Sequence, residues 1–403
     1  MTALEQHWPD TYRHARKYSP FYRARWQGRR GVPSLSTLPL TDKKMISRRP
    51  ADFLCVPPHR IAEIVTTSGT TGQPLLWPMT SSDINRLAEN EKISFTCAGL
   101  TPRDRVLVAV AMDRCFIAGL AYWQGLQALG CTVIRAGASS AQLVLELLTR
   151  TRPTAIIGVP SFLRLIAERA RAADQGLKRS SVKKLICIGE PIRQADFTLN
   201  PTGAWLRQAW GAEVFSTYGV TELANSLCEC PAGRGGHLHE HQLHLEILDA
   251  AGQPLPAGEV GEVVATTFGV EAMPLIRYRT GDCAALHTSP CACGRATPRL
   301  GPIVGRKNQL LKFKGTSLFP STIQTALEAA GVEKFVVIAR RENELSDAVE
   351  IRYHGQSSPA ALREAVQARA RITPLIRRAS RAAIDQLQLP PDQRKRRTFV
   401  DLR

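Results

Sequence analysis

A short segment rich in hydroxyl groups and glycine is the sharpest chemical signal in this sequence. It runs from Thr66 to Pro74 (TTSGTTGQP) and follows the apolar run RIAEIV. Glycine lets backbone N–H groups approach phosphate oxygens, and the hydroxyls add donors and can contact Mg²⁺. No Lys follows the second glycine, so the segment is not a G-x-x-x-x-G-K-[ST] loop. It predicts a phosphate-binding turn, with a plain turn that binds nothing as the alternative.

A second group of residues has the chemistry of a metal site. Cys291 and Cys293 lie in a tight C-x-C-G turn, and Cys230 and His237 lie earlier in the same half of the chain. Three thiolates and one imidazole can complete a closed tetrahedral Zn²⁺ site of the structural type. The alternative is that these are reduced cysteines in a loop. Other residues nearby could serve as ligands instead: Cys228, His239 and His241.

The elements that must position these residues alternate between strand and helix from about residue 104 to 190. We expect strands at 105–112, 131–136, 154–159 and 183–189, with helices at 116–129, 139–151 and 160–173. This alternation indicates βαβ units and parallel strand pairing. After residue 235 strands and turns dominate, and a small α+β region follows. The predicted fold class is α/β, with a large domain over 1–305 that includes a β-rich subdomain and a small domain over 306–403.

Composition and charge limit the class of protein. The chain has 403 residues, of which 44% are hydrophobic and 22% charged, as in ordinary globular proteins. Its 53 Lys and Arg residues exceed its 35 Asp and Glu residues, so it could bind phosphate-rich ligands or nucleic acid. Because these cations are spread along the chain, nucleic acid is not the expected main partner. No membrane-spanning run and no apolar leader are present, so we expect a cytoplasmic protein.

Further motifs follow the phosphate-binding turn in a fixed order. They are Gly189-Glu190-Pro191, YGVTE at 218–222, YRTGD at 278–282 and Gly305-Arg306. In this order and approximate spacing they resemble the adenylate-forming superfamily, and the chain as a whole resembles a phenylacetate–CoA ligase-like acyl-adenylate synthetase. Supporting matches are SPFY at 19–22, CACGR at 291–295 and the run from Lys314 to Pro320. Each motif is short, and the ordered set carries the resemblance.

The resemblance implies a site for ATP and Mg²⁺. The turn would cover the β- and γ-phosphates, Glu222 would help hold Mg²⁺, and Thr221 and Glu222 would be catalytic. Tyr218 would stack on adenine, and Asp282 with Arg306 would bind the ribose. Many members carry Lys where this chain has Gln73, which removes one cation from the phosphates. The implied nucleotide-binding residues are Thr67, Ser68, Gly69, Thr70, Thr71, Gly72, Gly189, Glu190, Pro191, Tyr218, Gly219, Asp282 and Arg306.

The resemblance also gives roles to the C-terminal segment and to the cysteines. Lys395 in QRKRRTFVDLR aligns with the catalytic lysine of the superfamily, although Arg394 replaces the usual glycine. The small domain would be mobile and would rotate about Lys307–Gln309 between two half-reactions. A solvated basic tail is the alternative. Some relatives bind a metal through matching Cys and His positions, which favours the zinc site.

An apolar, partly aromatic set of residues would form the acid pocket, as it does in relatives. Such a pocket suits an aryl or arylacetic acid. Its implied members lie in the helix at 116–130 and in the segments near 158–162 and 216–219: Phe116, Tyr122, Trp123, Val159, Phe162 and Ser216.

The implied function is ATP-dependent activation of a carboxylic acid to acyl-AMP with release of pyrophosphate, followed by acyl transfer to a thiol. Coenzyme A is the expected acceptor. One alternative is delivery to a carrier protein or an amine in a biosynthetic pathway. Another is a basic, zinc-containing nucleic-acid-binding protein without catalysis, supported by Gln73 and the net charge of +18. The oligomeric state, a homodimer included, is left open.

Overall fold

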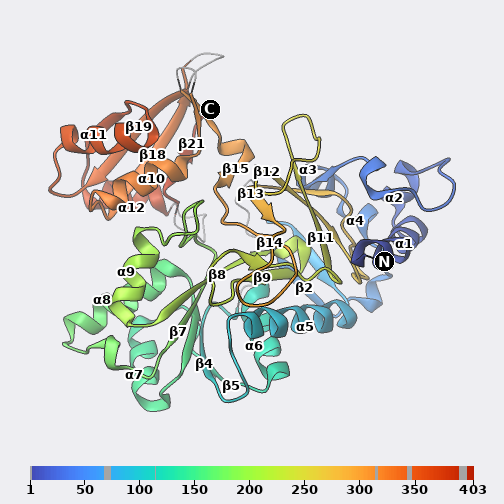
Figure 1. The fold of residues 1–403 in the computed structure, drawn as a ribbon, viewed down its shortest axis with the longest axis horizontal. Helices are drawn as coiled ribbons and strands as arrows, with labels where there is room; N and C mark the ends of the chain where they lie inside the picture. Colours follow the sequence, from blue (N-terminus) through green and yellow to red (C-terminus); the bar gives the residue numbers. More distant parts are fainter. Residues whose placement is uncertain (1, 68–73, 114, 314–315, 343–346, 390–396) are drawn as a thin grey trace. The chain divides into compact units, whose positions relative to one another are not determined.

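The computed structural model describes residues 2–67, 74–113, 115–313, 316–342, 347–389 and 397–403 (Figure 1). The chain divides into two compact units. The larger comprises Met1–Leu199, Gly203–Thr280 and Ala284–Pro302, and the smaller comprises Asn200–Thr202, Gly281–Cys283 and Ile303–Arg403. In the described part of the chain, no helix has the length and apolar character that a membrane crossing requires.

A six-stranded sheet forms the centre of the larger unit. Its strand order is β5-β4-β6-β7-β8-β9, and the first five strands are parallel, as the alternation of strands and helices predicted. β9 returns antiparallel to β8, which the sequence pattern did not indicate. The strands are β4 (Arg105–Ala109), β5 (Thr132–Arg135), β6 (Ala155–Gly158), β7 (Lys184–Ile188), β8 (Glu213–Val220) and β9 (Asn225–Cys228).

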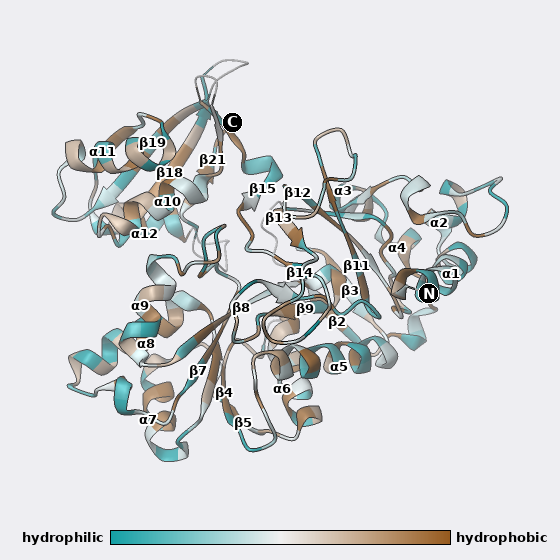
Figure 2. Ribbon diagram, viewed as in Figure 1, coloured by the Kyte–Doolittle hydropathy of each residue, from teal (hydrophilic) through white to brown (hydrophobic). Residues whose placement is uncertain are grey.

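Helices cover both faces of this sheet because alternate strand residues point in opposite directions. Val106 and Val108 share a core with the first helix pair, α5 and α6, whereas Leu107 and Ala109 pack with α7, α8 and α9. Figure 2 shows the apolar character of the strands between these helices. The helices are α5 (Ser81–Cys97), α6 (Ile117–Leu129), α7 (Ala141–Thr151), α8 (Pro160–Ala172) and α9 (Pro201–Trp210).

The predicted β-rich region is a second sheet. Its main path runs β10-β14-β13-β12-β11, and both β1 and β15 also pair with β13. A separate hairpin is formed by β2 (Glu63–Thr66) and β3 (Leu76–Met79), on either side of the predicted phosphate-binding segment in the sequence. The strands of the second sheet are β1 (Thr41–Asp42), β10 (Gly236–His237), β11 (Leu243–Leu248), β12 (Val260–Thr267), β13 (Tyr278–His287), β14 (Arg299–Leu300) and β15 (Gly305–Arg306).

The N-terminal segment adds short helices to the larger unit. Pro20, Tyr22 and Phe53 lie in helices that meet around stacked aromatic rings, with Tyr22 and Trp26 ring centroids 4.7 Å apart. The Tyr22 hydroxyl accepts a hydrogen bond from the Ile276 N–H at 3.1 Å, which ties this segment to the second sheet. The helices are α1 (Ala3–Tyr18), α2 (Pro20–Arg25), α3 (Lys43–Arg48) and α4 (Pro50–Phe53).

The smaller unit has its own core around a four-stranded sheet of order β20-β19-β18-β21. Arg403 ties its first segment to that sheet, because its guanidinium bonds the carbonyls of Asn308 and Leu310 and the carboxylates of Asp347 and Asp401. The elements are β16 (Leu311–Phe313), β17 (Thr316–Leu318), α10 (Pro320–Ala329), β18 (Lys334–Arg341), β19 (Asp347–His354), α11 (Pro359–Ala370), β20 (Leu375–Arg378), α12 (Arg381–Gln388) and β21 (Phe399–Asp401).

Candidate functional site

The predicted phosphate-binding segment 66–74 connects β2 and β3, and the described contacts at its ends involve Thr67 and Leu75. Thr67, which is 2% exposed, donates its N–H to the Leu75 carbonyl at 3.0 Å and accepts the Leu75 N–H on its hydroxyl at 3.0 Å. This double contact orients the Thr67 hydroxyl. The predicted phosphate-binding residues Ser68, Gly69, Thr70, Thr71 and Gly72 lie outside the described residues, as does Gln73. They therefore stay predictions.

Glu222 of the YGVTE motif comes to the same place as Thr67. β8 ends at Val220, and the 3-10 turn Thr221–Leu223 carries Glu222 into the interior, where it is 7% exposed. The Lys43 ammonium lies 2.9 Å from the Glu222 carboxylate and donates a hydrogen bond to the Thr67 hydroxyl at 3.1 Å. The Tyr278 hydroxyl is 3.5 Å from the same carboxylate. The structure thus assembles predicted residues around a lysine that the sequence analysis missed.

The oxygen atoms of this cluster suit the predicted Mg²⁺. Magnesium prefers carboxylate and other oxygen ligands and is usually held by one or two carboxylates together with substrate phosphates. Glu222 offers the carboxylate and Thr67 a hydroxyl. Both residues are buried, and both contact Lys43. When bound, Mg²⁺ would neutralise phosphate charge.

The Gly189-Glu190-Pro191 motif follows β7 at the carboxyl end of the parallel strands. Gly189 has a φ of +75°, a left-handed conformation that favours glycine. The Glu190 carboxylate accepts hydrogen bonds from the N–H and the hydroxyl of Ser161, at 2.9 and 2.8 Å, at the start of α8. The side chain of Glu190 thus holds the start of a neighbouring helix, and nucleotide binding by this motif stays a prediction.

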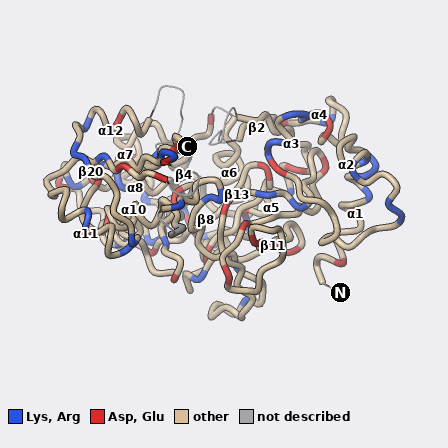
Figure 3. Tube along the Cα trace, turned by 90° about the horizontal axis from the view of Figure 1, so that it is seen from above, with Lys and Arg blue, Asp and Glu red and all other residues tan. Residues whose placement is uncertain are grey.

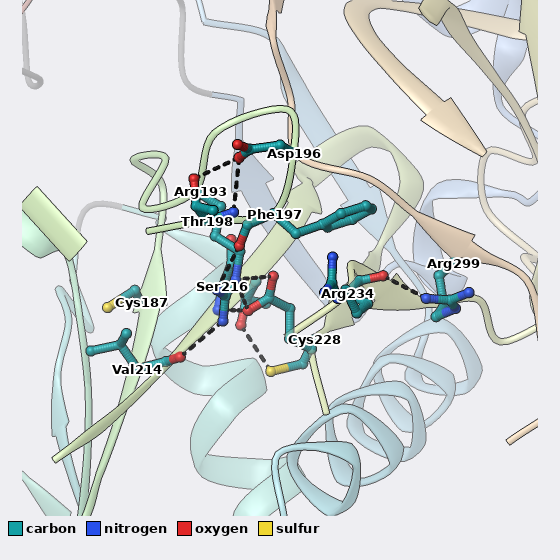
Figure 4. Close-up of polar contacts among 12 residues, drawn as sticks. Cys187, Arg193, Asp196, Phe197, Thr198, Val214, Ser216, Cys228, Arg234 and Arg299 are labelled. Carbon is teal, nitrogen blue, oxygen red and sulfur yellow. Dashed lines mark hydrogen bonds and ion pairs between the residues drawn. The ribbon is translucent and has the colours of Figure 1, made fainter. Parts of the chain in front are cut away.

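An ion pair between the partly buried Arg193 and the buried Glu229 fixes the segment that follows this motif, and Figure 4 shows Arg193 near Phe197 and Ser216. The Arg193 Nε lies 2.7 Å from both oxygens of Glu229, and its Nη1 donates to the Phe197 carbonyl at 2.9 Å. Glu229 also accepts the Ser216 N–H of β8 at 3.0 Å. Burial raises the pKa of Glu229, and Arg193 works against that shift. The pair therefore links the Gly189–Pro191 segment to the strand that carries Tyr218.

Asp282 and Arg306, the residues predicted to bind ribose, are also brought together. They are directly opposite in the antiparallel pairing of β13 and β15, and the Arg306 Nε lies 3.1 Å from an Asp282 carboxylate oxygen. Both residues belong to the smaller unit. The predicted catalytic residue Lys395 lies outside the described residues.

The predicted acid pocket is divided between the two faces of the central sheet. Phe116, Tyr122 and Val159 pack in the core beneath α5 and α6. Phe162 packs instead against the core beneath α7 and α8, on the opposite face of the sheet. Phe162 follows the start of α8 and is partly buried on that helix's side of the sheet, and its place in an acid pocket stays a prediction. Trp123 is partly buried, with the Arg135 guanidinium 6.0 Å from its ring, and Ser216 is partly buried on β8.

A carboxyl group that the sequence did not single out lies beside this apolar core. Glu91 of α5 is 3% exposed and accepts a hydrogen bond from the Ser226 hydroxyl at 2.8 Å. The helices are close here, since a Cβ on Gly125 of α6 would lie 2.4 Å from the Glu91 Cβ. Burial raises the pKa of Glu91 to about 8, so the neutral form is favoured.

The four predicted metal ligands gather into one cluster. The ligand atoms of Cys230, His237, Cys291 and Cys293 all lie within 4.8 Å of one another. Cys230 Sγ is 3.6 Å from Cys291 Sγ, and Cys293 Sγ is 3.4 Å from His237 Nε2. Sulfur ligands at about 2.3 Å from a tetrahedral Zn²⁺ would be about 3.8 Å apart. The geometry of these residues therefore fits a zinc ion.

The surroundings of the cluster also favour metal binding. His237 Nδ1 lies 2.9 Å from the Thr297 hydroxyl, a contact that leaves Nε2 to face the sulfurs. Burial, with Arg295 and Arg299, lowers the pKa of His237 to about 4, so its ring is neutral at pH 7. Two of the three alternative ligands have other partners: His239 Nδ1 contacts Asn90, and Cys228 accepts a hydrogen bond from Thr217.

Comparison with known proteins identifies the family of this chain. Residues 23–271 match the family of AMP-binding enzymes. The chain is similar to phenylacetate-coenzyme A ligase from Thermus thermophilus, with 31% identity over 80% of this chain and 72% of that protein. It is similar to the Escherichia coli protein of the same name at 29% identity over 78% of this chain and 72% of that one.

Solved structures show the same fold. A 2-hydroxyisobutyryl-CoA ligase in its postadenylation state aligns with a TM-score of 0.85 and 21% identity, over 100% of this chain and 89% of that one. An amide bond synthetase from Marinactinospora thermotolerans aligns with a TM-score of 0.61 and 21% identity, over 80% of this chain and 65% of that one. The chain therefore shares the fold of these solved structures.

Proposed function

Because this chain belongs to the AMP-binding enzyme family, we propose that it activates a carboxylic acid with ATP and transfers the acyl group to coenzyme A. The observation that supports this function best is the convergence of Thr67, Lys43 and Glu222 at the end of β8. A hydroxyl from the predicted phosphate turn, an ammonium and a carboxylate meet there, which are the groups that Mg·ATP requires.

The reaction has two steps. In the first, a carboxylate oxygen of the acid attacks the α-phosphorus of ATP, the bond from that phosphorus to the bridging oxygen breaks, and acyl-AMP and pyrophosphate form. In the second, the thiol of coenzyme A attacks the acyl carbon, loses its proton to solvent, and AMP leaves with the electrons of the C–O bond. Negative charge develops around the α-phosphorus in the first step, so preorganised cations accelerate it.

We assign roles in binding Mg²⁺, adenine and ribose to residues of the nucleotide motifs. Glu222 with Thr67 would hold Mg²⁺, and Tyr218 would pack on adenine next to the Gly189–Pro191 backbone. Asp282 and Arg306 would bind the ribose. Residues 306–403 would form the mobile domain, which would bring Lys395 to the phosphates for the first step and withdraw it for the second. A small set of hinge residues is enough for such a rotation.

The acid is proposed to be an aryl or arylacetic acid. Phe116, Tyr122 and Val159 supply apolar and aromatic surface in one core, close to β8. The relatives named above are phenylacetate-coenzyme A ligases, which fits this class of substrate. A carrier-protein thiol or an amine as acceptor remains the alternative for the second step.

The Cys/His cluster is proposed to hold one structural zinc. Its ligands come from the segment just after β9, from β10 and from the turn before β14, so a metal would join three segments of the larger unit. A closed four-ligand site leaves no position for substrate and contributes to folding rather than to chemistry.

The decisive experiment measures pyrophosphate release from purified protein with Mg·ATP and a panel of acids, each with and without coenzyme A. We expect release that depends on an aromatic acid, and a thioester when coenzyme A is present. Absence of acid-dependent release across a broad panel would overturn the proposed function. Figure 3 shows Lys and Arg scattered along the described chain, so salt-dependent binding to nucleic acid is not expected.

A further inference from the structure

Lys43 lies in none of the motifs, yet it contacts two of them. Its Nζ is 2.9 Å from the Glu222 carboxylate and 3.1 Å from the Thr67 hydroxyl that begins the phosphate turn. The side chain of Lys43 is 25% exposed, whereas Glu222 is 7% exposed. The ammonium is therefore held by buried partners while part of it still faces solvent.

Long-range pairing brings Lys43 to this position. Thr41 and Asp42 form β1, which pairs in parallel with Tyr278 and Arg279 of β13. The Asp42 carboxylate then accepts the Met45 N–H at 2.8 Å and caps α3, so Lys43 is the first residue of that helix. A cation at a helix N-terminus is electrostatically unfavourable. Lys43 therefore does not stabilise α3 through the helix dipole. Its favourable interactions are those with Glu222 and Thr67.

The charges of the cluster explain why a cation matters at this point. A buried carboxylate beside a phosphate site repels the negative polyphosphate unless cations lie between or beside them. Lys43 supplies one positive charge next to Glu222. An ammonium has three donor hydrogens, and within the described part of the chain Lys43 uses two of them, on Glu222 and Thr67. Among the described residues no contact uses the third, which can donate to an oxygen of a ligand.

We propose that Lys43 binds the β- or γ-phosphate of ATP during adenylation and is a catalytic residue of that half-reaction. This inference rests on the proposed function. In this chain Lys43 supplies a cation to the polyphosphate from α3, and the turn itself carries Gln73 where a Lys is common. The ammonium offsets the charge of Glu222 in the free protein and that of the phosphates when ATP is bound.

The test compares Lys43→Met with Lys43→Arg and with a matched control, Lys44→Met, which changes the exposed lysine next in sequence. Calorimetry would measure binding of α,β-methylene ATP and of AMP at fixed Mg²⁺. We expect Lys43→Met to weaken binding of the ATP analogue on the order of tenfold and to slow acid-dependent pyrophosphate release on the order of a hundredfold, as for the loss of one charge-assisted contact.

The other readouts separate a ligand contact from a structural role. AMP has no β- or γ-phosphate, so its affinity should stay within about twofold, as should thioester formation from supplied acyl-AMP. Lys43→Arg should recover part of the ATP affinity, and Lys44→Met should behave as wild type. Equal losses for AMP and the ATP analogue, or unchanged analogue binding, would overturn the inference. Wild-type protein that releases no pyrophosphate with any acid would instead overturn the proposed function.

Discussion

Two polar clusters of the larger unit differ in how they use their charge. Lys43, Thr67 and Glu222 place opposite charges side by side, with the lysine still partly exposed. In the Cys/His cluster three of the four ligands are buried, and their ligand atoms face one another within 4.8 Å. The first cluster has donor and acceptor groups left for a ligand, whereas the second is complete once a metal is bound. The first cluster is accordingly proposed for chemistry and the second for stability.

The physical reason lies in what each cluster loses when it is altered. Under the proposed roles, a substitution at the first cluster would mainly affect ATP binding, because the partly exposed Lys43 can still be solvated when a partner is lost. A substitution at the second would remove a metal bond that forms only in the folded chain, so its effect would fall on folding. The predictions below compare the effect of each substitution on activity with its effect on stability.

The largest effect is expected for Glu222→Gln. This change removes the carboxylate while keeping the shape of the side chain, and adenylation should fall by a factor on the order of 10²–10³. The melting temperature should change by no more than a few degrees, since Lys43 can reach solvent. Steady-state pyrophosphate release at varied Mg²⁺ would measure the loss, with the exposed Glu240→Gln as the control. Loss of folding in place of activity would contradict the comparison.

An effect of similar size, confined to one half-reaction, is expected for Lys395→Ala. Acyl-AMP formation should fall on the order of 10²-fold, because one preorganised cation is lost from the first step. Thioester formation from chemically supplied acyl-AMP should be nearly unchanged. Arg394→Ala, Arg396→Ala and Arg397→Ala are matched controls and should each have much smaller effects. If one of them shows the selective loss instead, that arginine, not Lys395, is the catalytic cation.

For the Cys/His cluster we expect the reverse pattern. Purified protein should contain about one zinc per chain, and Cys291→Ser or Cys293→Ser should lower zinc content and melting temperature by several degrees. The KM values for ATP and acid should stay within about threefold. Metal analysis and thermal unfolding would measure this. Cys187→Ser, at a buried cysteine outside the cluster, is the control for the effect of replacing a thiol by a hydroxyl in the core. A metal-free preparation that melts at the same temperature would refute the site.

The smallest effect is expected for Glu91→Gln, and it depends on pH. The pKa of Glu91 is raised by burial to about 8 from an ordinary value near 4.5, so the folded state binds its proton more tightly than the unfolded state. Between these values the free energy of unfolding should decrease as pH rises, by at most about 1.4 kcal/mol per pH unit.

Glu91→Gln removes the titrating group and should flatten that dependence, making the variant more stable than wild type near pH 8. Denaturant unfolding at pH 5 and pH 8 would show it. The Ser226 contact can be kept by the amide, so Glu91→Gln is preferred to an alanine substitution. An unchanged slope with pH would mean that Glu91 is ionised in the folded protein.

Local patterns in the sequence determined the parts of this protein that depend on near neighbours. The alternation of apolar strands and amphipathic helices from 104 to 190 predicted the parallel sheet, and hydrophobic periodicity is a local property. The motifs named Thr67, Glu222 and Asp282, and the Cys and His residue types named the four residues that cluster in the structure. Their roles in nucleotide and metal binding stay predictions.

Only the tertiary structure decided which distant residues complete the site. Lys43 reaches Glu222 through the pairing of β1 with β13, and Arg193 meets Glu229 across the sheet. Glu91 is buried because α6 packs closely on α5, and Phe162 faces a different core from Tyr122. Such contacts depend on strand order, register and helix packing, which are set by interactions across the whole chain. A charged residue that completes a site in this way looks in sequence like any exposed lysine or glutamate.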